Sequence, residues 1–197
     1  VAEAEWQACL EVIEQLDCGY LVASGSLPCG VPDDFYALVA TICRRRNMKL
    51  VLDTSGEALR AALGQGIHLV KPSLGELEGL LNRKLSDPEA QEAAVRQLIK
   101  NGGSEMIALT LGSDGALLAT KQLMLRLAAP KVEAKSAVGA GDSFLAAMTL
   151  GLAQGRIPDA AFAYGLAAGA ATVLSAGTGL CRREDVERLY TEVLQEP

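Results

Sequence analysis

The chain has 197 residues, half of them hydrophobic and only 4% aromatic, so alanine, leucine and valine must build the core. This length is enough for one domain with a sizeable core. The formal net charge of −6 argues against a nucleic-acid partner, because phosphate backbones require a basic face. No apolar run approaches membrane-spanning length and no signal peptide is visible, so we expect no membrane partner.

The cysteine pattern indicates a reducing compartment. The five cysteines are Cys9, Cys18, Cys29, Cys43 and Cys181, an odd number without a C-x-x-C pair. Scattered reduced thiols fit this pattern better than a disulfide framework or a zinc site. We therefore expect a cytoplasmic protein.

Hydrophobic periodicity and turn residues predict helices that alternate with strands. In chain order, the expected elements are a helix over residues 3–17, a strand over 20–23, a helix over 32–46 with Pro32 in its first turn, a strand over 48–52, a helix over 57–63, a strand over 67–70, helices over 74–81 and 88–101, a strand over 106–111, a hairpin over 116–120 and 123–127, a helix that ends near 155, and helices over 158–175 and 183–195. This alternation implies a mostly parallel sheet covered by helices on both faces, within one α/β domain over residues 1–197.

Polar residues follow the predicted parallel strands where each strand ends. Ser26 follows the first strand, Asp53 the second, Lys71 and Glu76 the third, and Gly112 the fourth. Ligands of open α/β sheets bind at the carboxyl ends of the strands. The sequence therefore predicts the functional site at this edge.

The stretch Lys135–Ser143, KSAVGAGDS, has the form of a loop that opens a helix. Gly139 and Gly141 permit unusual backbone angles and the close approach of a ligand. The free N–H groups of the first helical turn then form an anion site, for which phosphate is the common occupant. Asp142 lies in the same turn and would repel a bound phosphate, unless it accepts a proton from an attacking hydroxyl. The alternative is that Asp142 only complements the helix dipole.

Val138–Ser143 resembles the signature of the PfkB, or ribokinase-like, carbohydrate kinases. Three further stretches resemble the family in the same order: Ala23–Pro28, Val70–Ser73 continuing to Glu76, and Thr110–Gly115. The resemblance covers almost the whole chain and is nearest to the hexose-phosphate branch. It implies a three-layer α-β-α fold, an anion hole formed by Gly139, Ala140 and Gly141, and Asp142 as the catalytic base.

The resemblance also implies a reaction. The family transfers a phosphoryl group from ATP, with Mg²⁺, to a sugar hydroxyl, and the branch suggests fructose 6-phosphate as acceptor. Tagatose 6-phosphate and fructose 1-phosphate are alternative substrates. The residues implied in binding the nucleotide are Lys71, Ser73, Thr110, Gly112, Ser113 and Gly115, and Ser26 is implied in binding the sugar phosphate. Outside the family context, Lys71 would be a surface lysine, 112–115 a hairpin turn signalled by its Asp-Gly pair, and Ser26 a turn residue.

The metal positions depart from the family pattern. Glu76 matches the acid of an Asn-x-x-Glu motif that places magnesium-bound water, but Ser73 stands where the asparagine is usual. Gly75 stands where the branch carries a lysine for a regulatory nucleotide, which puts that regulation in doubt. The positions that match a potassium site are Ser136, Val138, Thr172, Ser175, Gly177 and Gly179, where serine at 175 replaces asparagine and glycine at 179 replaces arginine.

Two further expectations complete this interpretation. His68, the single histidine, lies in a strand pattern and is assigned to packing rather than catalysis.

Full-length relatives carry an upstream segment with the sugar-binding residues and a lid that often forms a homodimer, and that segment is absent from this chain. A non-catalytic nucleotide-binding fragment is therefore the alternative from another class.

Overall fold

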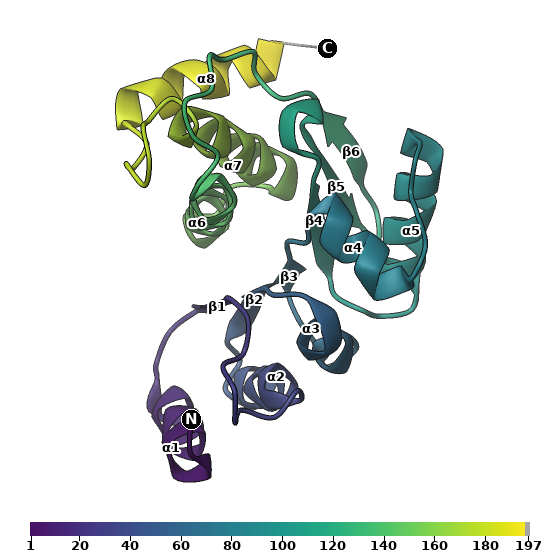
Figure 1. Ribbon diagram of the computed structural model, residues 1–197, viewed down its shortest axis with the longest axis vertical. Coiled ribbons are helices and arrows are strands. Elements are labelled where there is room, and N and C mark those ends of the chain that lie inside the picture. Colours follow the sequence, from purple (N-terminus) through teal and green to yellow (C-terminus); the bar gives the residue numbers. More distant parts are fainter. Residues whose placement is uncertain (196–197) are drawn as a thin grey trace. The chain divides into compact units, whose positions relative to one another are not determined.

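A computed structural model describes residues 1–195 of the chain and shows two compact units (Figure 1). The first unit holds residues 1–109 together with 119–124, and the second holds residues 110–118 and the chain from 125 onward. The helices are α1 (Glu3–Gln15), α2 (Phe35–Arg45), α3 (Gly56–Ala62), α4 (Leu74–Leu81), α5 (Pro88–Lys100), α6 (Ala140–Ala153), α7 (Pro158–Thr172) and α8 (Arg183–Gln195), with a 3-10 turn η1 at Gly112–Asp114. The strands are β1 (Tyr20–Ser24), β2 (Lys49–Asp53), β3 (Leu69–Val70), β4 (Met106–Thr110), β5 (Ala116–Thr120) and β6 (Met124–Leu127).

The six strands form one sheet in the order in which they occur along the chain. Strands β1 to β4 pair in parallel, with Ser24 opposite Asp53 and Val70 opposite Ile107. A tight turn joins β5 to β6, where the N–H of Thr120 donates to the carbonyl oxygen of Leu123 at 2.8 Å. The predicted α/β class with a mostly parallel sheet is confirmed. Because β1 and β2 are parallel, the residues that follow them lie together at the carboxyl ends of the strands.

The inner strands are apolar because both of their faces are covered. Leu50, Val51 and Leu52 of β2 are fully buried, as expected for parallel strands with helices on both faces. Strand β1 differs, since it pairs only with β2 at the end of the sheet and leaves Val22 48% exposed. Helix α1 also has no buried residue.

Most element boundaries agree with the prediction to within two residues, but α7 ends at Thr172 rather than at residue 175. Helix α2 begins at Phe35 rather than at Pro32, because Pro32 lies in a turn whose carbonyl oxygen accepts from the N–H of Phe35 at 3.0 Å. Strand β3 is only two residues long, so His68 precedes the strand instead of lying within it. Asp87 caps α5, since its carboxylate accepts from the N–H of Ala90 at 2.8 Å.

In the second unit, α6 packs closely against α7, and α7 against α8. Two glycines of α7 make the first contact possible. A Cβ at Gly165 would lie 2.9 Å from the Phe144 carbonyl oxygen, and one at Gly169 would lie 3.2 Å from the Ala140 carbonyl oxygen. Small residues therefore allow the α6 backbone to approach α7. Over residues 1–195, no helix is both long and apolar enough to cross a membrane.

Candidate functional site

The glycine-rich stretch forms the start of α6 in the second unit. Gly139 directly precedes the helix with φ 77° and ψ 0°, a left-handed conformation that glycine adopts without a steric penalty. Within residues 1–195, the backbone N–H groups of Gly141 and Asp142 have no hydrogen-bond partner, whereas those of Ala140 and Ser143 do. The Asp142 side chain is exposed beside these two groups. A pair of free donors next to a carboxylate is the arrangement predicted for an anion hole with a base.

The loop before α6 is anchored to the end of α7. The N–H of Lys135 donates to the carbonyl oxygen of Val173 at 2.7 Å, and the Ser136 hydroxyl donates to that of Gly177 at 2.9 Å. Thr172 is buried, and its methyl group would lie 3.9 Å from a Cβ at Gly139. These contacts bring the loop and the end of α7 together, which are the two segments implied in the potassium site.

The remaining cation positions lie in the same connection. The N–H of Val138 donates to the Ser136 hydroxyl at 3.3 Å, and the Ser175 hydroxyl donates to the Leu180 carbonyl at 3.0 Å. Ser175 thus uses its proton within the loop, and Gly177 has φ 60°. Among residues 1–195 there is no group of three or more His, Cys, Asp and Glu side chains that could hold a metal.

The segment 110–115 forms a tight turn in the second unit. The N–H of Leu111 donates to the Gly115 carbonyl at 2.9 Å, and η1 lies between them. Gly115 has φ 99°, and a Cβ there would lie 2.0 Å from the Leu127 carbonyl oxygen, so only glycine fits. Gly112 and Ser113 are exposed at the tip of the turn. The turn interpretation and a nucleotide contact are compatible.

In the first unit, Lys71 is neither a free surface lysine nor an unpaired cation. Its side chain is only 6% exposed, and its Nζ lies 3.0 Å from a carboxylate oxygen of Asp53, which is 14% exposed. The two residues follow neighbouring strands, since Asp53 ends β2 and Lys71 follows β3. The sequence marks Asp53 as a polar residue at the end of a strand and assigns it no role. Only the pairing of β2 with β3 brings the two charges together.

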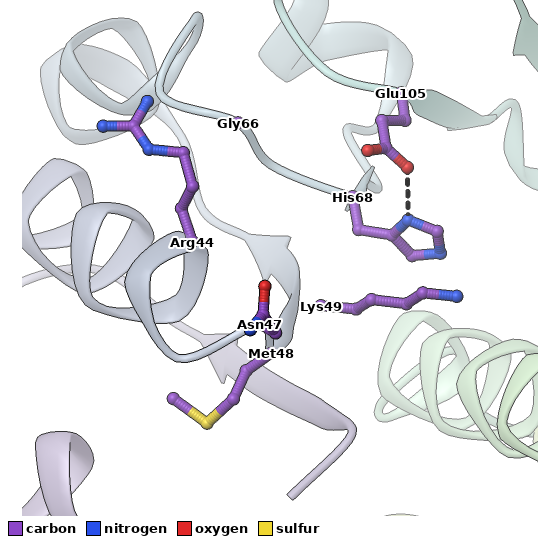
Figure 2. Close-up of a pocket in the computed structure, with 7 residues that line it drawn as sticks. All are labelled: Arg44, Asn47, Met48, Lys49, Gly66, His68 and Glu105. Carbon is purple, nitrogen blue, oxygen red and sulfur yellow. Dashed lines mark hydrogen bonds and ion pairs between the residues drawn. The ribbon is translucent and has the colours of Figure 1, made fainter.

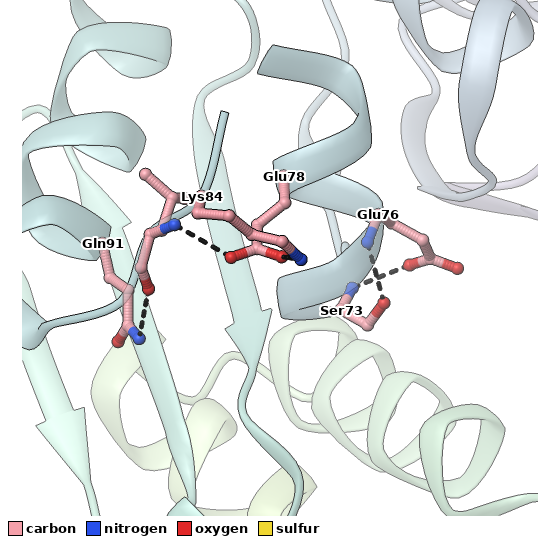
Figure 3. A network of polar contacts seen from close by, with 6 residues as sticks. Ser73, Glu76, Glu78, Lys84 and Gln91 are labelled. Carbon is pink, nitrogen blue, oxygen red and sulfur yellow. Dashed lines mark hydrogen bonds and ion pairs between the residues drawn. The ribbon is translucent and has the colours of Figure 1, made fainter. Parts of the chain in front are cut away.

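Ser73 and Glu76 form a reciprocal cap at the start of α4 (Figure 3). The Ser73 N–H donates to Oε2 of Glu76 at 2.7 Å, and the Glu76 N–H donates to the Ser73 hydroxyl at 3.3 Å. This is the capping box, which serine forms well. The backbone N–H of Ser73 thus holds the Glu76 carboxylate at the helix terminus, and the serine hydroxyl that replaces the usual asparagine amide caps the Glu76 N–H.

His68 lies at the opposite ends of the strands from Asp53, in a shallow pocket of the first unit (Figure 2). Its Nδ1 lies 2.6 Å from a carboxylate oxygen of Glu105, and Lys49 lies alongside. Its Nε2 is buried and has no partner within residues 1–195. Burial lowers the pKa of His68, while the hydrogen bond with Glu105 opposes that shift. His68 therefore has a hydrogen-bond partner in Glu105 in addition to the expected packing role.

A family model for "pfkB family carbohydrate kinase" matches residues 2–185. The chain is 42% identical over 196 residues to the ATP-dependent 6-phosphofructokinase isozyme 2 of Mycobacterium tuberculosis, covering 98% of this chain and 57% of that protein. It is 34% identical over 177 residues to the 1-phosphofructokinase of Borreliella burgdorferi, covering 89% and 56%. A crystal structure of phosphofructokinase-2 from Escherichia coli in complex with potassium superimposes with a TM-score of 0.95 at 35% identity, covering 99% of this chain and 64% of that one.

These findings define an α/β protein of ribokinase-like fold, as the sequence predicted. The chain belongs to the pfkB family of carbohydrate kinases. It spans less than two thirds of the length of each of the three relatives described.

Proposed function

We propose that the protein to which this chain belongs transfers the γ-phosphoryl group of ATP to a hydroxyl of a sugar phosphate. The observation that carries the proposal is the pair of free N–H groups of Gly141 and Asp142, which follow left-handed Gly139 beside the exposed Asp142 carboxylate. The acceptor oxygen attacks the γ-phosphorus, its proton passes to Asp142, and ADP leaves with the electrons of the broken P–O bond. The loop Gly139–Gly141, assigned to the anion hole from the sequence, stabilises the transferring oxygens through the free N–H groups of Gly141 and Asp142, since the N–H of Ala140 donates to the Ala137 carbonyl at 3.3 Å.

The other residues are assigned supporting roles. Lys71, Ser73 and the turn from Thr110 to Gly115 bind the nucleotide, and Ser26 binds the sugar phosphate. Glu76 suits a magnesium site because its Oε2 is fixed by Ser73, so the carboxylate is oriented for a metal-bound water. Bound Mg²⁺ supplies neutralisation of the phosphate charge. A potassium ion held near Ser136, Val138, Thr172, Ser175 and Gly177 is part of the same proposal.

Fructose 6-phosphate is the acceptor we favour, because the 42% identity to a 6-phosphofructokinase exceeds the 34% identity to a 1-phosphofructokinase. Fructose 1-phosphate and tagatose 6-phosphate are the alternatives. A panel of the three substrates on the full-length protein decides among them. The proposal further includes a cytoplasmic location, one catalytic domain and a homodimer of the full-length enzyme.

The test of the base is Asp142→Asn in the full-length protein. We expect turnover to fall on the order of a hundredfold or more, because the amide cannot accept the proton. The matched control is Asp159→Asn, since Asp159 also lies in the first turn of a helix and complements its dipole. Near-native turnover of the Asp142 variant would reduce Asp142 to a helix-dipole residue.

The second candidate function is a non-catalytic nucleotide-binding fragment. It is favoured by one observation, the coverage of only 56% to 64% of the relatives. Adding the upstream segment as a separate polypeptide, and following MgATP binding and phosphoryl transfer, distinguishes the two functions. Binding without any restored transfer would favour the fragment.

A further inference from the structure

Two buried hydroxyl groups converge on one backbone carbonyl at the edge of the sheet that carries Ser26. The Tyr36 hydroxyl of α2 donates to the carbonyl oxygen of Gly25 at 2.9 Å, and the Thr54 hydroxyl donates to the same oxygen at 2.9 Å. Tyr36 is 6% exposed and Thr54 is 5% exposed. Both donors reach Gly25 from other elements, so they hold the turn after β1 from two directions.

The other side of Gly25 is fixed as well. Its N–H donates to the carbonyl oxygen of Asp53 at 2.8 Å, which extends the pairing of β1 with β2 by one residue. Gly25 has φ 107°, a backbone conformation that residues with a side chain rarely adopt. The turn is therefore not held by local sequence preference alone, and three hydrogen bonds from other elements stabilise it.

The next residue is the one that faces outward. Ser26 is exposed, and neither its N–H nor its hydroxyl has a hydrogen-bond partner within residues 1–195. A fixed peptide on one side and two free donors on the other suit a small anion such as the phosphate group of a sugar. The phenol of Tyr36 remains a donor at neutral pH, since burial, with the charge of Asp53, raises its pKa.

We propose that Tyr36 and Thr54 are positioning residues that hold the Gly25 carbonyl and thereby aim Ser26 at the phosphate group of the sugar substrate. This inference rests on the proposed function. Neither residue touches the substrate; both act through the peptide that carries Ser26. Asp53 connects the same turn to the nucleotide side, because its carbonyl holds Gly25 and its carboxylate holds Lys71.

The test uses Tyr36→Phe, Thr54→Val and the double variant in the full-length protein, with fructose 6-phosphate as the probe. Each lost hydrogen bond is expected to raise the KM for the sugar phosphate about two- to tenfold, while the KM for ATP stays within about twofold. The matched controls are Thr149→Val, whose buried hydroxyl has no hydrogen-bond partner among residues 1–195, and Tyr190→Phe in α8. Both controls should leave the KM for the sugar phosphate unchanged.

A second readout is independent of catalysis. In the 197-residue chain, amide exchange of Gly25 should become at least severalfold faster in both single variants, and the controls should not change it. An unchanged sugar-phosphate KM in an active enzyme, or an unchanged Gly25 exchange, would overturn the positioning role. A full-length wild-type protein that phosphorylates no sugar phosphate would instead refute the proposed function, and the exchange measurement would still report whether the two hydroxyls hold the turn.

Discussion

The buried ammonium group of Lys71, which follows β3, is balanced by the carboxylate of Asp53 at the end of the neighbouring strand β2. The two side chains lie 3.0 Å apart and are largely shielded from water. Asp53→Asn would leave an ammonium group buried beside a neutral amide, so we expect the free energy of unfolding to fall by about 3 kcal/mol or more. Urea denaturation of the chain measures this loss.

The control for that experiment is Glu57→Gln, which removes an exposed partner of Arg60. Exposed ion pairs contribute little, so a change below about 0.5 kcal/mol is expected. Equal losses in the two variants would mean that burial does not matter at the Lys71 pair.

His68, the single histidine of the chain, is the residue through which we expect the free energy of unfolding to depend on pH near neutrality. Burial lowers its pKa, so the unfolded chain binds a proton more readily than the folded one. The free energy of unfolding should therefore decrease as the pH falls from about 7.5 through the unfolded value of about 6.5 toward the lower folded pKa. Urea denaturation midpoints measured across this pH range test how steeply the free energy of unfolding changes with pH, and His68→Gln should flatten that dependence. A steeper slope in the variant would contradict the assignment.

At the scale of elements, the packing of α6 on α7 sets the position of the glycine-rich loop within the second unit. Gly165→Ala would place a methyl group 2.9 Å from the Phe144 carbonyl oxygen, which cannot move as a side-chain end can. We expect a loss of about 1 to 3 kcal/mol in the free energy of unfolding. Gly79→Ala is the matched control, because Gly79 lies in α4 with nothing within 4 Å of the new Cβ, and it should stabilise by about 0.5 to 1 kcal/mol. Denaturant titration measures both changes. If both variants lost stability, or both gained it, close packing at Gly165 would be excluded as the cause of its loss.

At the scale of the whole molecule, strand β1 leaves one edge of the sheet unpaired within the described residues. Its Val22 is 48% exposed, and an exposed edge strand is a template for pairing with another chain. We expect concentration-dependent self-association of the isolated chain in sedimentation velocity. Val22→Lys should reduce it, because a charge on the edge opposes strand pairing. Leu180→Lys is the control, since Leu180 is 84% exposed outside any strand or helix. If both variants reduced association equally, the sheet edge would not be its cause.

The sequence by itself determined the order and type of the elements, the parallel sheet and the loop with Gly139 and Asp142. These features depend on hydrophobic periodicity and on residues near one another in the chain, so local patterns predict them.

Only the tertiary structure decided the partners of residues that lie far apart in the chain. Lys71 was predicted from its strand end, but its pairing with Asp53 follows from the register of β2 and β3. Tyr36 and Thr54 gave no signal in the sequence, because a buried hydroxyl donating to a distant carbonyl leaves no local pattern. The predicted start of α2 was wrong for a local reason, since a turn closed by the N–H of Phe35 and the carbonyl of Pro32 outweighed the preference of Pro32 for a first helical turn. Local preferences fix the elements, whereas long-range hydrogen bonds and burial decide which groups meet.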